Sequence, residues 1–77
     1  MHLSAAANLL APAYLSILSK GYVVQVEGGL MVAVRGTDRF SADGPVELLG
    51  VIAIAETRGE NWQATDEEID DFLSRFG

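Results

Sequence analysis

The chain has 77 residues, a formal net charge of −6 at pH 7, and a composition that is 49% hydrophobic and 21% charged. This length suits one domain, residues 1–77, and the composition is that of a globular protein rather than a disordered tail. The acidic balance argues against nucleic-acid binding, which depends on clustered lysine and arginine. The absence of cysteine excludes disulfides, thiolate metal sites and a cysteine nucleophile.

Residues 3–19 contain no charged side chain, which raises the question of export or membrane insertion. A secretory signal needs a basic region before its apolar stretch, and only the α-amino group and His2 are available here. Ala5-Ala6-Ala7 resembles a small-residue cleavage site, so export remains the minor alternative. Polar residues and Pro12 keep every apolar run below the roughly 18 residues of a membrane helix. We therefore expect a cytoplasmic protein that does not enter a membrane.

The first predicted element is a helix in the N-terminal segment, because apolar residues from Leu3 to Leu18 recur at three- and four-residue spacing. Ser4 is the expected N-cap. Pro12 lacks an N–H group, so it should kink this helix or begin a second one. Lys20 followed by Gly21 predicts the end of the helix, since a cation and a residue free to adopt positive φ both suit that position.

Two strands of a hairpin are predicted at Tyr22–Val26 and Leu30–Val34. A three-residue loop, Glu27–Gly29, pairs Val24 with Val32 and Tyr22 with Val34, which gives one fully apolar face. A two-residue turn would place Val26 opposite Met31 and Tyr22 opposite Arg35, mixing polar and apolar residues. We therefore favour the three-residue loop. The same reasoning predicts a loop at residues 36–38 and a short third strand, Arg39–Ala42, with Phe40 opposite Val34.

The next helix is predicted to begin at Pro45, with Asp43 or Gly44 as the N-cap and Glu47 near the positive end of the helix dipole. Its body, residues 46–57, is apolar on nearly every side, which predicts a buried helix. Gly50 lies in the middle and suggests that another element packs closely there. A buried strand at Val51–Ala55 is the alternative.

The last predicted element is a helix that follows the capping box Thr65–Glu68. Its apolar side chains lie on one stripe: Ile69, Phe72, Leu73 and Phe76. We expect this stripe to belong to the core, so that replacing Ile69 or Phe72 by alanine destabilises the fold by roughly 2–5 kcal/mol. Trp62 is expected to anchor the helix on the rest of the molecule. The fold class is therefore α+β: helix, three-stranded antiparallel meander, helix, helix.

The residues offer little for catalysis, so we expect a protein that is not an enzyme and needs no cofactor. The only histidine is His2, at a terminus, and the only lysine is Lys20, at a predicted helix end. Acids four residues apart on the last helix could together hold a hard cation, but their spacing departs from the calcium-loop pattern, and no metal site is predicted. No phosphate-binding glycine loop is present.

The order of elements resembles the topology of double-stranded RNA-binding domains. In that family the helix after the sheet is rich in lysine, whereas here residues 46–58 contain one basic residue, Arg58. The residues thus contradict a role in RNA binding.

The remaining signal is an uneven distribution of charge. Residues 1–26 contain no acid, whereas residues 56–71 contain seven acids and one arginine. An acidic surface of this kind attracts basic proteins, although it also serves solubility. We expect a protein partner, and we predict that it contacts Asp66, Glu67, Asp70 and Asp71, with Trp62 as an aromatic anchor. An inhibitor, immunity-protein or antitoxin-like role toward a basic protein fits these features.

The alternative is an adaptor that forms a homodimer through its N-terminal helix. Leu3, Leu10 and Ile17 follow one line on that helix, while Leu9 and Leu15 lie away from it. A domain this small has little sheet with which to cover all of them. Molar mass in solution distinguishes the two hypotheses.

Overall fold

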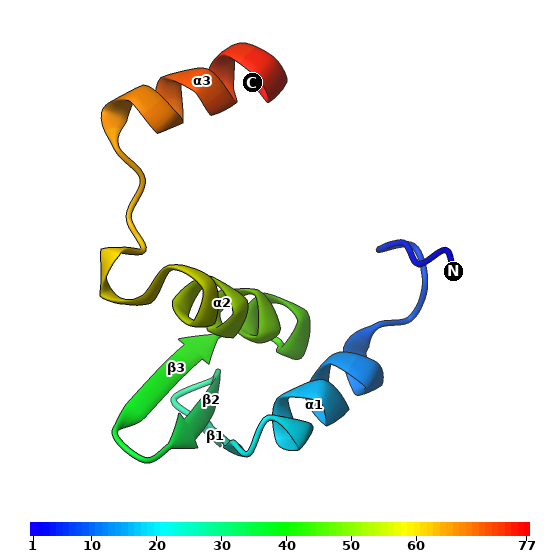
Figure 1. Cartoon of the computed structure of the whole chain (residues 1–77). Helices are drawn as coiled ribbons and strands as arrows, with labels where there is room; N and C mark the ends of the chain where they lie inside the picture. The colour runs from blue at the N-terminus through cyan, green and yellow to red at the C-terminus, as the bar shows by residue number, and fades with distance from the viewer.

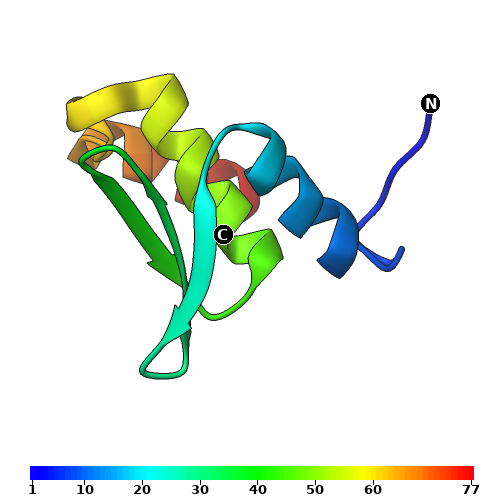
Figure 2. The same ribbon diagram turned by 90° about the horizontal axis from the view of Figure 1, so that it is seen from below.

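The computed structural model describes residues 1–77. The elements are, in chain order, α1 (Leu10–Ser19), β1 (Val23–Glu27), β2 (Leu30–Arg35), β3 (Asp38–Ala42), α2 (Pro45–Arg58), the short 3-10 helix η1 (Gly59–Asn61) and α3 (Asp66–Phe76). The strands form an antiparallel meander in the order β1-β2-β3. Helices α1 and α2 pack against each other and against the sheet (Figure 1 and Figure 2). The chain is a small α+β protein with the predicted order of elements.

The first helix is shorter than predicted. It begins at Leu10, so residues 1–9 lie outside it and Ser4 does not cap it. Pro12 lies in the first turn, where its missing N–H leaves no helical hydrogen bond unmade. The helix ends as predicted, with Lys20 as the C-cap and Gly21 at a φ of +93°. Its inner side is buried at Ala13 and Ile17.

Both predicted loop lengths in the sheet are wrong, because two-residue turns connect the strands. Gly28 and Gly29 both have positive φ, +56° and +81°, as a type I′ turn requires, and Glu27 pairs with Leu30. The second turn is formed by Gly36 and Thr37, with Gly36 at a φ of +60°. Turns with positive φ match the twist of antiparallel strands, and this local preference favours the observed register.

In this register, Val24, Ala33 and Phe40 are neighbours across the sheet, and Val32 and Val34 point to its other side. The predicted pairing of Val24 with Val32 is therefore wrong. Its premise was that a charged residue opposite Tyr22 would spoil the apolar face. In the structure, the guanidinium of Arg35 stacks over the Tyr22 ring, 4.4 Å from its centroid, and donates to the Lys20 carbonyl at 2.7 Å. Arg35 thus closes the end of the core.

The second helix begins as predicted, with Gly44 as the N-cap, Pro45 in the first helical position and Glu47 in the first turn. It continues through Val51–Ala55, so the strand alternative is wrong. Leu48 and Ile52 are fully buried and join the core with the following residues: Ile17, Tyr22 and Ala33. The expectation of burial on every side is wrong, because Val51 and Ile54 are exposed and nothing lies within 4 Å of a side chain added at Gly50.

The last helix has the predicted capping box. Glu68 N–H donates to the Thr65 hydroxyl at 3.2 Å, and Thr65 N–H donates to the Glu68 carboxylate at 2.8 Å. The predicted packing of this helix is wrong: α3 packs against neither the sheet nor the other two helices, and it stands apart from α2 (Figure 1). Ile69 and Phe72 are exposed, so they are not core residues. The periodicity revealed an apolar face but not the surface that covers it.

Candidate functional site

The candidate site has three parts, and the first is the polar side of α3. One side of the helix carries all four predicted contact acids. Asp66 and Asp70 are four residues apart, as are Glu67 and Asp71, and the two pairs are adjacent. The apolar stripe lies on the opposite side. The structure therefore gathers the four predicted contact acids on one exposed surface, which we call the acidic face.

Only part of the acidic face is free of positive charge. The Nε of Arg75 donates to both carboxylate oxygens of Asp71 at 3.0 Å. Asp66, Glu67 and Asp70 form no ion pair. The unpaired negative charge therefore lies in the first two turns of α3.

Arg58 holds the segment between α2 and α3. Its Nε donates to the Trp62 carbonyl at 2.9 Å, and another guanidinium nitrogen lies 3.8 Å from the Glu68 carboxylate. Hydrogen bonds from the backbone of Thr65 and then from its side chain lower the pKa of Glu68 below its ordinary 4.5, and the charge of Arg58 acts in the same direction. The ionised capping box and Arg58 together set where α3 begins.

The second part of the site surrounds Trp62. This residue follows η1. The prediction that it anchors α3 on the rest of the molecule is wrong, because α3 packs against none of the other helices or strands. Instead Trp62 lines a hollow of about 310 Å³ with Phe40 of β3 and the outer side of α2, Val51, Ile54 and Ala55. Every lining residue is hydrophobic. We call this hollow the apolar groove.

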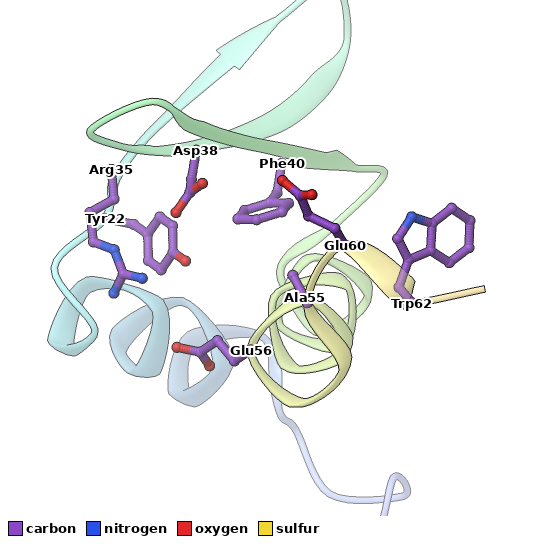
Figure 3. A pocket seen from close by; sticks show the side chains of 9 residues that line it. Tyr22, Arg35, Asp38, Phe40, Ala55, Glu56, Glu60 and Trp62 are labelled. Atoms are coloured by element: carbon purple, nitrogen blue, oxygen red, sulfur yellow. The ribbon is translucent and has the colours of Figure 1, made fainter. Parts of the chain in front are cut away.

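The third part is a larger hollow of about 500 Å³ that shares Phe40, Ala55 and Trp62 with the apolar groove. Figure 3 shows Asp38 and Phe40 of β3 facing Ala55 and Glu56 of α2, with Tyr22 and Arg35 at one end and Trp62 at the other. Glu60 also lines it. We call this hollow the polar groove.

The net charge available in the polar groove is negative. Glu56 is paired with Lys20 at 2.8 Å, and Arg35 is occupied by the Tyr22 ring and the Lys20 carbonyl. Asp38 and Glu60 form no ion pair. Their carboxylates lie beside a wall of aromatic rings, in which Tyr22 and Phe40 make an edge contact with 6.0 Å between centroids. Aromatic faces and carboxylates together suit a cationic side chain.

Sequence reasoning missed Asp38 and Glu60. Asp38 directly follows the turn of Gly36 and Thr37, and acids are common beside turns for local reasons. Glu60 lies in the short helix η1. They line the same hollow only because the hairpin of β2 and β3 meets the end of α2. No local sequence pattern predicts this contact between the hairpin and the end of α2.

The structure brings no group of three possible metal ligands together. Lys20 is engaged with Glu56, and His2 lies in the segment before α1. None of the helices combines the length and apolar character needed to span a membrane.

In comparisons with known proteins, no family model matched the chain, and no significant match was found among curated proteins or solved structures.

Proposed function

We propose that this chain is a small non-catalytic binding protein that holds a basic protein partner in the cytoplasm, in an inhibitor, immunity-protein or antitoxin-like role. The observation that carries the proposal is the exposed position of α3 and its unpaired acids. This helix stands away from the rest of the molecule and presents Asp66, Glu67 and Asp70 without basic partners. Exposed charges of one sign accelerate association with an oppositely charged partner.

The polar groove supports the same assignment. Asp38 and Glu60 add two further carboxylates without an ion pair, and Figure 3 shows the Phe40 ring between them and Trp62 beyond Glu60. A lysine or arginine of the partner would find both a charge partner and an aromatic surface there. The acidic face would then steer the partner, and the polar groove would hold one of its side chains.

The test is a capture experiment with tagged protein in lysate from its own source, washed at low and then at high salt. We expect one basic protein that is released by salt, because exposed charge pairs are screened. A variant with Asp66→Asn, Glu67→Gln and Asp70→Asn should bind the purified partner roughly tenfold or more weakly at low salt. Asp71→Asn is the matched control, since Arg75 already neutralises Asp71. Capture that resists high salt and is unchanged in the triple variant would contradict the proposal.

A second candidate is an adaptor that dimerises through α1. The observation in its favour is the outer side of this helix, where Leu10 and Leu15 are each about 60% exposed and Tyr14 and Leu18 are partly exposed. Changing Leu10 and Leu15 to glutamine would abolish such a dimer. Molar mass measured by light scattering would report it directly.

A further inference from the structure

We propose that the apolar face of α3 docks into the apolar groove of a second copy of the chain, so that two protomers exchange their C-terminal helices around a two-fold axis. The acidic face lies on the opposite side of α3 and stays accessible in this dimer. The dimer is argued from the apolar surfaces alone, although Phe40 and Trp62 line both the apolar groove and the polar groove.

The apolar face of α3 needs a cover. Its residues, Ile69, Phe72, Leu73 and Phe76, are between 44% and 77% exposed, and the Phe72 and Phe76 rings lie 5.6 Å apart. An isolated helix of this length is marginal in water, even with good caps. Burying these four side chains would supply the stabilisation that α3 lacks within its own protomer.

The apolar groove matches this face in chemistry. Val51 and Ile54 project from the outer side of α2, and Phe40 and Trp62 enclose them without any charged residue in the lining. An amphipathic helix that lays its apolar face into such a groove is a common mode of association. The acids of α3 lie opposite its apolar face, so docking brings no negative charge into the groove.

The same chain carries both complementary surfaces, and this favours a second copy as the occupant. Two protomers related by a two-fold axis satisfy both surfaces twice and leave neither open. Within one chain, the contacts of Arg58 with Trp62 and Glu68 hold the start of α3 at the end of α2 rather than along its groove. Helix exchange leaves these contacts in place.

The area is sufficient for a stable dimer. An eleven-residue helix is about 16 Å long and about 10 Å wide, so half of its lateral accessible surface, with the radius of a water molecule included, is roughly 350 Å². Docking this face removes about that area of helix, and a similar area of the facing protomer in and around the groove, from water. The contact occurs twice, which gives about 1,400 Å², within the range of specific protein interfaces.

Light scattering across a range of protein concentrations tests the proposal. We expect a mass of twice 8.2 kDa that does not change with salt. Two double variants should shift the dimer toward monomer by at least tenfold in dissociation constant: Phe72→Ser with Phe76→Ser, and Val51→Gln with Ile54→Gln. These side chains are exposed in the protomer, and circular dichroism would verify that each variant remains folded. The control with Leu10→Gln and Leu15→Gln should remain a dimer.

Disulfide trapping identifies the surfaces, because the chain has no cysteine of its own. Protein with Ile54→Cys, mixed with protein carrying Leu73→Cys, should form a mixed disulfide dimer faster than either forms a dimer with itself. A monomeric wild type would overturn the proposal, and so would a dimer abolished by the α1 variant. In the variant with both cysteines, a bond formed within one chain at high dilution would also overturn it, since α3 would then occupy its own groove. These results do not test salt-sensitive binding of a basic partner to the acidic face, which lies on the opposite side of α3.

Discussion

Two arginines connect neighbouring elements of the fold through stacking and hydrogen bonds. Arg35 stacks on Tyr22 and donates to the carbonyl at the end of α1, which joins the sheet to the first helix. Arg58 donates to the Trp62 carbonyl and lies near Glu68, which joins α2 to the segment before α3. A planar guanidinium with several donors is suited to such bridges. Both contacts depend on residues that are distant in sequence or lie across a turn.

The glycines differ in what they do, and two substitutions expose the difference. Gly36→Ala should destabilise the fold by about 1–2 kcal/mol, because φ at this position is +60°. Gly50→Ala should stabilise it by up to about 1 kcal/mol, because Gly50 lies within α2 with open space around it. Urea unfolding followed by circular dichroism at a low protein concentration measures both changes. A destabilising Gly50→Ala would mean that another element packs against this point of α2.

At the scale of elements, α3 is a helix whose start is well determined and whose packing is not. Its capping box, its first-turn acids and the contact of Arg75 with Asp71 are all local. They define where the helix begins, and they place acids at its N-terminal end and an arginine at its C-terminal end. They add little to the stability of the molecule unless the apolar face is covered.

The capping box predicts a pH dependence of α3. Because Thr65 and Arg58 lower the pKa of Glu68 in the folded chain, ionised Glu68 stabilises the helix. This contribution is complete above the ordinary value of 4.5 and is lost as the pH falls through the lowered folded value. We expect lower protection of the α3 amides below about pH 4.5, measured by NMR as the exchange rate relative to the intrinsic rate at each pH. The Glu68→Gln variant should lose most of this dependence, and an unchanged profile would show that the cap is not its source.

At the scale of the whole molecule, the protomer is extended and thinly packed. Its radius of gyration is 14.4 Å, whereas a compact domain of this length has about 11.5 Å. Seven of the 77 residues are buried, and the core lies where α1, α2 and the sheet meet. A chain with so little buried surface gains stability when a partner or a second copy covers its exposed apolar faces.

The distribution of buried residues predicts which substitutions destabilise the fold. At a dilution that keeps the chain monomeric, Ile52→Ala should lower the free energy of unfolding by roughly 2–5 kcal/mol, because Ile52 is fully buried. Phe72→Ala should lower it by less than about 1 kcal/mol, since Phe72 is more than half exposed. Urea unfolding compares the two, with Ile52→Val as a milder variant if Ile52→Ala does not fold. An equal loss in Phe72→Ala would show that α3 packs on its own protomer.

The order of the elements and several of their ends could be predicted from local patterns in the sequence. Gly21, Pro45 and the Thr65–Glu68 box act on neighbouring backbone groups, so their effects can be predicted from adjacent residues. The candidate acids were likewise predictable as one face of a helix, because helical periodicity places them together.

The strand register, the course of α3 and the site around Trp62 depend on contacts between distant segments. The two-residue turns favour the observed register locally, and Arg35 stacking on Tyr22 makes this register compatible with the core, through a contact across the sheet that apolar alternation does not describe. The apolar face of α3 was visible in the sequence, but what covers it depends on which surfaces meet. Asp38 and Glu60 share a groove because a hairpin meets a helix end. Such meetings arise from packing between distant segments, which local patterns do not encode.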